Sequence, residues 1–387
     1  MNKRTVYLDN AATTFPKPES VCYEMYKCTR EYCGNPGRGT NSLAIKASET
    51  IYETRARLKE FFFAPTEDNV IFTFNATYAL NIAIKCFIPQ HTHVLISDIE
   101  HNAVYRPVIA QAIKGKLSFD FFSTHGGDGQ RILADIIKKT RRNTSAVICT
   151  AASNICNLTL PIDEIGSYCK KRGILFILDA SQYAGHSELN IQKQGISILC
   201  APAHKGLYGP QGLGFMVIGE DASPICTLIE GGSGVNSKDL SMPKTLPEML
   251  EAGTLNTQNA KGLSESLKYL SSIGFENIIS YERYLSENMK QMLIEHKKLT
   301  IHGDYGEGCV FSVSDEDMST EELADSLNEY GVMIRSGLHC APLAHKTIGT
   351  SETGTVRFSL GIFNTLSDIE YTDDVLKKVL YNNSCRK

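Results

Sequence analysis

Four apolar segments of this sequence each end in, or lead to, polar residues of types that take part in catalysis. His101 follows VLIS (94–97), and Asn154 follows AVICTA (146–151). The segment ILFILDA (174–180) contains Asp179 and leads to Gln182, and ISILCA (196–201) leads to His204 and Lys205. In open α/β sheets, ligands bind beyond the carboxyl ends of the strands. Each of these residues alone more often has a structural role, but the set indicates a site at one edge of a sheet.

A lysine and a buried carboxylate in such a set fit one kind of chemistry. The amine of Lys205 can form a Schiff base with a carbonyl cofactor. Pyridoxal 5'-phosphate (PLP) withdraws electrons only while its pyridine nitrogen is protonated, and Asp179 suits that role. His101 offers an aromatic ring to the cofactor, and a helix opening at Asn75-Ala76-Thr77, after the apolar IFTF, offers backbone N–H groups to its phosphate. The sequence therefore predicts a PLP enzyme.

Alternating helical and strand-like patterns between about residues 42 and 295 must position these residues. Apolar residues keep helical spacing from Leu43 to Phe62. The apolar runs above, together with GFMVIG (214–219), are typical of strands buried on both faces of a parallel sheet. Pro161 to Arg172, followed by Gly173, is predicted to be a helix between two strands. We predict an α/β fold with a mostly parallel sheet flanked by helices.

After about residue 258 the pattern becomes that of a smaller α+β unit. Two long helical patterns at 258–296 precede strands at 309–314, 332–336 and 355–361, a helix opened by the capping box Ser319–Glu322, and a last helix. We predict a large cofactor-binding domain at 13–257 and a small C-terminal domain at 258–387, with residues 1–12 packing on the small domain.

The composition favours a small-molecule enzyme. The 387 residues include 39 Lys and Arg against 43 Asp and Glu, a net charge of −4, so we expect no partner among nucleic acids or anionic membranes. The start MNKRTVYLDN lacks the apolar core of a secretory signal, and no apolar run approaches the roughly 18 residues of a membrane span. The 12 cysteines form no CxxC pair, and Cys149, Cys200 and Cys309 lie in apolar segments. We expect reduced thiols in a cytoplasmic enzyme.

Cys340 has surroundings unlike those of the other cysteines. Arg335 precedes it, Gly337 loosens the backbone, and His339 and His345 flank it in a polar segment. Positive neighbours raise the thiolate fraction of a cysteine, which indicates a nucleophile. His339, Cys340 and His345 can also be interpreted as metal ligands, but no fourth ligand cluster supports that alternative, and we predict no metal.

Eight segments, in order along the chain, resemble one family. They are YLDNAATT, SDIEHNAV, ASN, LDASQ, AHKGLYGPQGLG, EAGTLNT, RSGLHCAPLAH and VRFSLGIFNT. They resemble the cysteine desulfurases and selenocysteine lyases, in the class V aminotransferase group of fold-type I PLP-dependent enzymes. The resemblance covers essentially the whole chain. AHKGLYGP together with RSGLHCAP is highly specific, whereas DNAATT alone is only suggestive.

The resemblance implies a role for each matching residue. Three residues would be catalytic: Lys205 as the Schiff-base lysine, His101 as the ring partner that also moves protons, and Cys340 as the nucleophile. Cofactor contacts would come from Asp179 to the pyridinium, Gln182 to the phenolic oxygen, and Ala76, Thr77, His204 and a second subunit's Thr254 to the phosphate. Substrate contacts would come from Asn154, which also lies at the cofactor, from Arg357, whose guanidinium fork matches a carboxylate, and from Ala12, Arg38 and Arg335 at the mouth.

The sequence also departs from the family pattern. Pro202 and Ala203 precede His204, where the family usually has Ser or Thr and then Gly, so one hydroxyl for the phosphate is missing. Asn75 and Ala76 replace a pair of small residues that usually carries a hydroxyl. Both changes predict weaker binding of the cofactor phosphate.

The resemblance implies conversion of L-cysteine to L-alanine, with a persulfide formed on Cys340 for delivery to an acceptor. Three alternatives stay open: a selenocysteine lyase acting on L-selenocysteine, another C–S or C–Se lyase, and a class V aminotransferase that forms no persulfide. Thr254 implies a homodimer. The short segment from Cys340 to Arg357 resembles the family branch in which a sulfur-acceptor protein must approach the site closely.

Overall fold

A seven-stranded sheet forms the centre of the chain in a computed structural model, which describes residues 4–37, 39–235, 238–306 and 308–384. The strand order is β2-β8-β7-β6-β5-β3-β4. The strands are β2 (Val70–Thr73), β3 (Thr92–Ser97), β4 (Leu117–Phe122), β5 (Thr144–Thr150), β6 (Leu175–Asp179), β7 (Ile198–Pro202) and β8 (Gly214–Ile218). All neighbouring pairs are parallel except the two that include β8. The predicted mostly parallel α/β sheet is confirmed.

Two details of this sheet differ from the sequence pattern. GFMVIG forms β8, which is buried throughout but antiparallel to its neighbours. A continuous apolar run reports burial on both faces and carries no information on strand direction. Strand β4 was not predicted, because it is an edge strand whose middle residues are partly exposed and whose sequence, LSFDFF, is interrupted by Asp120.

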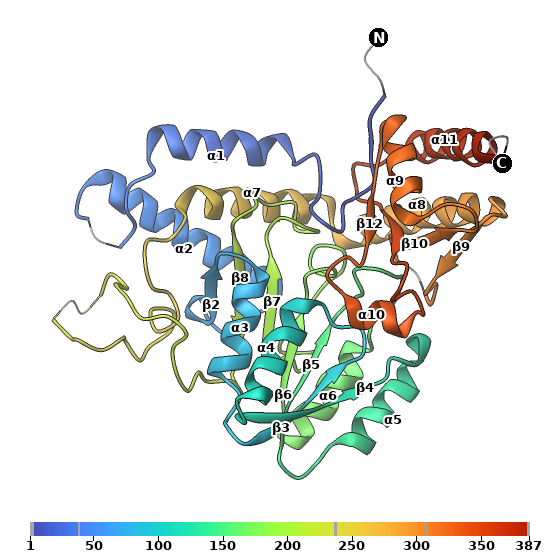
Figure 1. The fold of residues 1–387 in the computed structure, drawn as a ribbon. Coiled ribbons are helices and arrows are strands. Elements are labelled where there is room, and N and C mark those ends of the chain that lie inside the picture. The colour runs from blue at the N-terminus through green and yellow to red at the C-terminus, as the bar shows by residue number, and fades with distance from the viewer. Residues whose placement is uncertain (1–3, 38, 236–237, 307, 385–387) are drawn as a thin grey trace.

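Helices cover both faces of the large sheet (Figure 1). One face packs against α2 (Ser42–Phe62), α5 (Gly129–Lys139), α6 (Ile162–Arg172) and α7 (Thr257–Ile273). The other face packs against α3 (Ala76–Cys86) and α4 (Asn102–Ile113), and α1 (Glu19–Glu31) packs on α7. Because side chains alternate along a strand, Ile177 of β6 belongs to the second core while Phe176 and Leu178 belong to the first.

The predicted helix after Pro161 is confirmed as α6. It ends at Gly173, whose φ of 64° is the left-handed conformation that favours glycine after a helix. The predicted capping box is also confirmed, because Ser319 and Glu322 bond reciprocally at the start of α9 (Thr320–Glu329).

A second, four-stranded antiparallel sheet has the order β12-β13-β10-β9. Its strands are β9 (Leu299–His302), β10 (Val310–Asp315), β12 (Arg335–Gly337) and β13 (Thr355–Ser359), and the remaining helices of this part are α8 (Phe275–Glu295), α10 (Pro342–Thr347) and α11 (Leu366–Ser384). The single strand predicted at 332–336 is two strands, because β11 (Val332–Met333) pairs with β1 (Val6–Tyr7) and β12 pairs with β13. The N-terminal chain thus lies beside the C-terminal part (Figure 1).

The predicted division near residue 258 remains a prediction. Helix α7 begins at Thr257 and buries Leu263 and Leu267 in the core of the large sheet, whereas Val6 and Leu8 lie in the core of the second sheet. None of the helices in the described part of the chain combines the length and hydropathy of a membrane-spanning segment.

Candidate active site

One cavity of about 230 Å³ brings most of the predicted site residues together. It lies beyond the carboxyl ends of β5, β6 and β7 and beside the first residues of α3 and α4. Its lining includes Ala12, Ala76, Thr77, His101, Asn154, Asp179, Gln182, His204, Lys205, Arg335, Cys340 and Arg357. Thr254 lines other cavities, away from the Lys205 of its own chain. Arg38 lies outside the described residues.

Lys205 enters the cavity with an amine made more nucleophilic by its surroundings. Burial lowers the pKa of Lys205 to about 8; Asp179 opposes this shift, and Arg357 adds to it. A lower pKa leaves more of the amine neutral near pH 7, which is the form that attacks a carbonyl.

The backbone around Lys205 is fixed by the first residues of the chain. The carbonyl oxygen of Lys205 accepts a hydrogen bond from Thr14 Oγ1 at 2.9 Å. The carbonyl oxygen of His204 accepts from Thr13 Oγ1 at 3.1 Å and from Lys17 Nζ at 2.7 Å. The DNAATT segment therefore supports the lysine loop. This role was not predicted, although the motif itself was the available signal.

Asp179 and His101 meet the cavity from the ends of β6 and β3, which lie on either side of β5. Asp179 Oδ1 accepts from the amide nitrogen and the hydroxyl of Ser181, at 3.0 and 2.5 Å. His101 is the N-cap of α4, and its Nδ1 accepts from the amide of Ala103 at 3.0 Å. Its remaining proton must therefore lie on Nε2, and burial lowers the pKa of His101. The site thus has a fixed carboxylate and a neutral imidazole held in one orientation.

The start of α3 supplies a place for an anionic group. The Asn75 side chain caps the helix by accepting from the amide of Tyr78 at 2.9 Å. Ala76 and Thr77 line the cavity and lie in the first turn of α3, where an α-helix leaves its amides without a partner inside the helix. A Cβ on Gly214 would lie 2.5 Å from the backbone of Asn75, so this close approach requires glycine. His204 Nδ1 is buried without a partner, and burial lowers its pKa to about 4.

Two arginines face each other across strands β12 and β13. Arg335 and Arg357 are direct partners in the ladder, a placement that is destabilising for like charges unless an anion lies between them. Arg357 is 1% exposed and pairs with Asp9, with Nη2 2.5 Å from Oδ1, while its Nη1 donates to the Asn154 carbonyl oxygen at 3.0 Å. Its buried Nε has no partner. The pair fits a carboxylate ligand, and Asp9 is a contributor that was not predicted.

Cys340 lies in a strained turn at the mouth of the cavity. The amide of Ala341 donates to the Leu338 carbonyl oxygen at 2.9 Å, and the two residues between them, His339 and Cys340, have φ of 48° and 57°. This is the pattern of a type I′ turn, which Gly and Asn favour. Each left-handed residue with a side chain costs on the order of 1 kcal/mol or more, so the surroundings must hold it in place.

Hydrogen bonds to two carbonyl groups hold this turn against the rest of the site. The carbonyl of His339 accepts from Asn154 Nδ2, and that of Cys340 accepts from the Asn102 amide, both at 2.9 Å. No cluster of three or more ligating side chains suited to a metal occurs among the described residues.

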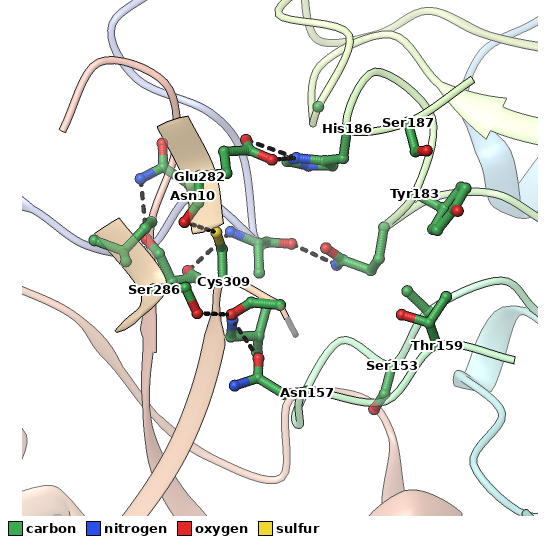
Figure 2. Close-up of a pocket in the computed structure, with 18 of the residues that line it drawn as sticks. Asn10, Ser153, Asn157, Thr159, Tyr183, His186, Ser187, Glu282, Ser286 and Cys309 are labelled. Carbon is green, nitrogen blue, oxygen red and sulfur yellow. Dashed lines mark hydrogen bonds and ion pairs between the residues drawn. The ribbon is translucent and has the colours of Figure 1, made fainter. Parts of the chain in front are cut away.

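A second cavity, of about 240 Å³, shares Ala11 and Gln182 with the lining of the Lys205 cavity. Figure 2 shows its polar lining. Two of its polar side chains pair with protein groups: His186 Nδ1 lies 2.8 Å from Glu282, and Asn157 accepts from the amide of Val310 at 2.9 Å. Cys309 faces this space, and burial raises the pKa of its thiol well above the ordinary range.

Exposure and position together separate Cys340 from the other described cysteines. The thiols of Cys149 and Cys200 are buried, and burial raises their pKa values well above the ordinary range, as at Cys309. Cys340 is exposed, and among the described cysteines it alone lines the Lys205 cavity.

The sequence matches the model of the Aminotransferase class-V family over residues 6–372. The chain belongs to the aminotransferase class-V family. It is 31% identical to a probable cysteine desulfurase of Methanothermobacter thermautotrophicus, over 97% of this chain and 94% of the relative. It is 30% identical to a probable cysteine desulfurase of Pyrococcus abyssi, over 98% and 95%.

Two solved structures are similar. The apo cysteine desulfurase of Thermococcus onnurineus NA1 has a TM-score of 0.89 and 27% identity, with 98% of this chain and 95% of that chain covered. The cysteine desulfurase CsdA of Escherichia coli has a TM-score of 0.86 at 22% identity, with 97% and 95% covered, which shows the shared fold alone.

PLP is the cofactor of this family, and the residues of the cavity fit it. Lys205 has an amine of lowered pKa for the aldehyde, and Asp179 has a fixed carboxylate for the pyridine nitrogen. The free amides of Ala76 and Thr77 and the unpaired His204 Nδ1 suit the phosphate. Gln182 Nε2 donates to the Ala11 carbonyl oxygen at 2.8 Å, and its second N–H is left for a phenolic oxygen.

Proposed function

We propose that this chain is a cysteine desulfurase, which converts L-cysteine to L-alanine and retains the sulfur as a persulfide on Cys340. One observation carries the proposal. The exposed thiol of Cys340 opens onto the same cavity as the Lys205 amine and the Arg335–Arg357 pair. A PLP enzyme that only exchanges amino groups needs no thiol there.

The arginines and Asn154 would bind and orient the substrate. Arg357 is held by Asp9 and by the Asn154 carbonyl, so its guanidinium is fixed before a ligand arrives. A carboxylate between Arg357 and Arg335 relieves the repulsion of two facing cations. This placement directs the amino group of the ligand toward Lys205 and its side chain toward the mouth, where Cys340 lies.

PLP, when bound, supplies an electron sink for the bonds at the substrate's Cα. Lys205, once its amine is free, is the residue suited to remove and return the Cα proton, because its lowered pKa keeps part of the amine neutral. His101 is held as the Nε2–H tautomer, so it can donate a proton from that atom.

The sulfur transfer itself takes place at Cys340. The Cys340 thiolate attacks the substrate's sulfur, and an S–S bond forms as the Cβ–S bond breaks. The electron pair of the broken bond stays with the carbon fragment, which takes up a proton and leaves as alanine. The product on the enzyme is a Cys340 persulfide, whose outer sulfur an acceptor thiol can then take.

Replacing Cys340 by Ala tests the proposal. Cys340→Ala is expected to retain the PLP absorbance and its change on adding cysteine, but to form alanine on the order of 10³-fold more slowly. The matched control is Cys22→Ala, another exposed cysteine that lies in α1; it should keep the wild-type rate. Wild type treated with cysteine should gain one sulfur on the peptide containing Cys340.

The same assay separates the alternatives. Selenocysteine assayed beside cysteine distinguishes a desulfurase from a selenocysteine lyase, for which cysteine would be a poor substrate and Cys340→Ala would have little effect. Transfer of the amino group to a keto acid, with no sulfur on Cys340, would identify an aminotransferase and contradict the proposal.

The proposal includes a homodimer and an acceptor protein. Thr254 does not line the Lys205 cavity of its own chain, which is consistent with a role for it in a second subunit. Light scattering should therefore find two chains in the active species, and Thr254→Val should weaken PLP binding. A fully active monomer would contradict this part. The exposure of Cys340 supports direct transfer to an acceptor thiol. The cytoplasmic location stays a prediction from the sequence.

A further inference from the structure

The turn that carries Cys340 is supported from behind by two buried histidines and a threonine. His339 Nε2 lies 3.2 Å from the Arg335 carbonyl oxygen, and His339 Nδ1 lies 3.4 Å from His345 Nε2. His345 Nδ1 lies 2.7 Å from Thr350 Oγ1. The two imidazoles are 4% and 0% exposed, so no water competes for these contacts.

One placement of protons satisfies all three contacts. A carbonyl oxygen can only accept, so His339 Nε2 carries the proton and His339 Nδ1 accepts. His345 Nε2 must then donate, which leaves His345 Nδ1 to accept from the Thr350 hydroxyl. Both rings must be neutral. This agrees with their pKa values, which burial lowers to about 3 for His339, with further lowering by Arg357, and to about 4 for His345, with further lowering by His302.

The chain of contacts ends on the strained part of the turn. His339 is the first of the two left-handed residues, and Cys340 is the second. Fixing the ring of His339 fixes the side-chain torsions of the residue just before the nucleophile. The chain after Thr350 also packs against the entry of the turn. The Gly354 amide donates to the Thr350 carbonyl oxygen at 2.9 Å, and a Cβ on Gly354 would lie 2.8 Å from the backbone of Gly337.

We propose that His345 and Thr350 are positioning residues, which hold the Leu338–Ala341 turn through His339 and so keep the Cys340 thiol at the mouth of the Lys205 cavity. Neither residue lines that cavity. The inference deepens the proposed function and rests on it, since Cys340 is taken as the sulfur-accepting nucleophile.

Thr350→Val tests the inference with the smallest change of shape. It removes the hydroxyl donor and leaves His345 Nδ1 without a partner, so the turn should open more often. The Ala341 amide, which donates to the Leu338 carbonyl oxygen and closes the turn, should exchange with solvent about five-fold faster or more, as expected for the loss of one buried hydrogen bond. The kcat for alanine formation should fall by a similar factor, while the KM for cysteine and the PLP spectrum stay near wild type. Thr350→Ser should restore the wild-type amide exchange and the wild-type kcat.

The matched control is Thr144→Val. It removes a hydroxyl 2.8 Å from the buried His93 Nδ1, at the opposite edge of the large sheet. The control should lose comparable stability without changing kcat or the exchange of the Ala341 amide. Equal effects on exchange and kcat in the two variants, or no effect in Thr350→Val, would overturn the inference.

Failure of the two proposals can be told apart. If wild type forms no persulfide on Cys340, the proposed function fails, whereas the exchange of the Ala341 amide still tests the support of the turn. If the persulfide forms but Thr350→Val exchanges and reacts as wild type does, only the positioning role is wrong.

Discussion

The two sides of the Lys205 cavity are built in different ways. On the side of the large sheet, Asp179 is the last residue of β6 and is fixed by the sheet ladder. Lys205 lies three residues beyond the end of β7, where Thr14 also holds its backbone. On the opposite side, Cys340 lies in a turn with two left-handed residues that only side-chain and loop contacts hold. The first side is held by the sheet and by the N-terminal segment packed on it, whereas the second is held by several separate hydrogen bonds that act on one short turn.

This difference matches the tasks proposed for the two sides. A cofactor that stays bound needs a site that does not move, and strand ends provide it. A thiol that must first meet the substrate's sulfur and then an acceptor needs exposure, which a buried strand end cannot give. The position of the Cys340 thiol therefore depends on individual contacts, and we expect substitutions on the two sides of the cavity to have different effects.

Lys205→Ala should give the largest effect and define the first side. Without the amine, no covalent link to PLP can form and no group of suitable pKa lies at the Cα proton. We expect alanine formation to fall on the order of 10³-fold or more. The measurement is borohydride reduction followed by mass spectrometry, which should find the cofactor's mass on wild type and on Cys340→Ala but not on Lys205→Ala. A covalent cofactor at another lysine would contradict the assignment.

The second largest effect should come from Asp9→Ala, which acts on the arginine pair. It leaves the buried guanidinium of Arg357 facing Arg335 without a counter-charge. Removing one partner of a buried ion pair typically costs about 3 kcal/mol or more. The free energy of unfolding in urea should fall by roughly that amount. The control is Lys377→Met, which removes an exposed pair with Asp373 and should cost less than about 1 kcal/mol. Similar losses in the free energy of unfolding of both variants would show that the Asp9–Arg357 pair contributes no more to stability than an exposed ion pair.

The sequence predicted the first side of the cavity better than the second for a physical reason. Continuous apolar runs report strands buried on both faces, and the residues after each run must meet at one sheet edge; Asp179, His101 and Lys205 were found in this way. The direction of β8 and the edge strand β4 leave no such signal. The support of Cys340 by Thr350, and of Arg357 by Asp9, depends on contacts between segments far apart in the chain, which no local pattern encodes.

A pH-dependent effect should distinguish the sheet side. Glu100, the residue before His101, is fully buried; its Oε1 accepts from the Thr150 amide at 2.8 Å, and its Oε2 has no partner. Burial raises the pKa of Glu100 to about 8, and Asp179 adds to the shift. The folded state therefore keeps a proton that the unfolded state loses near pH 4.5.

The proton on Glu100 determines how the stability of the fold changes with pH. The stability contributed by protonated Glu100 is complete below about pH 4.5 and is lost as the pH rises toward about 8, at up to about 1.4 kcal/mol per pH unit. Glu100→Gln keeps the shape without the titration, so its thermal midpoint should rise relative to wild type between pH 5 and pH 8. If the thermal midpoints of wild type and Glu100→Gln change with pH in the same way, Glu100 is ionised in the folded state.

The smallest effect should be the most specific test of the turn. Gly337 has a φ of 100° and a Cβ there would meet no atom within 4 Å, so Gly337→Ala adds backbone strain and no clash. Gly115 has a φ of 68° and equally open surroundings, between α4 and β4. Each substitution should cost about 1 kcal/mol of stability. Only Gly337→Ala should also slow persulfide formation, because its strain lies at the entry to the Cys340 turn and is relieved when that turn opens. If both variants lose the same stability and neither changes the persulfide rate, the conformation of the turn does not control the nucleophile. Cys340 would then owe its reactivity to exposure alone.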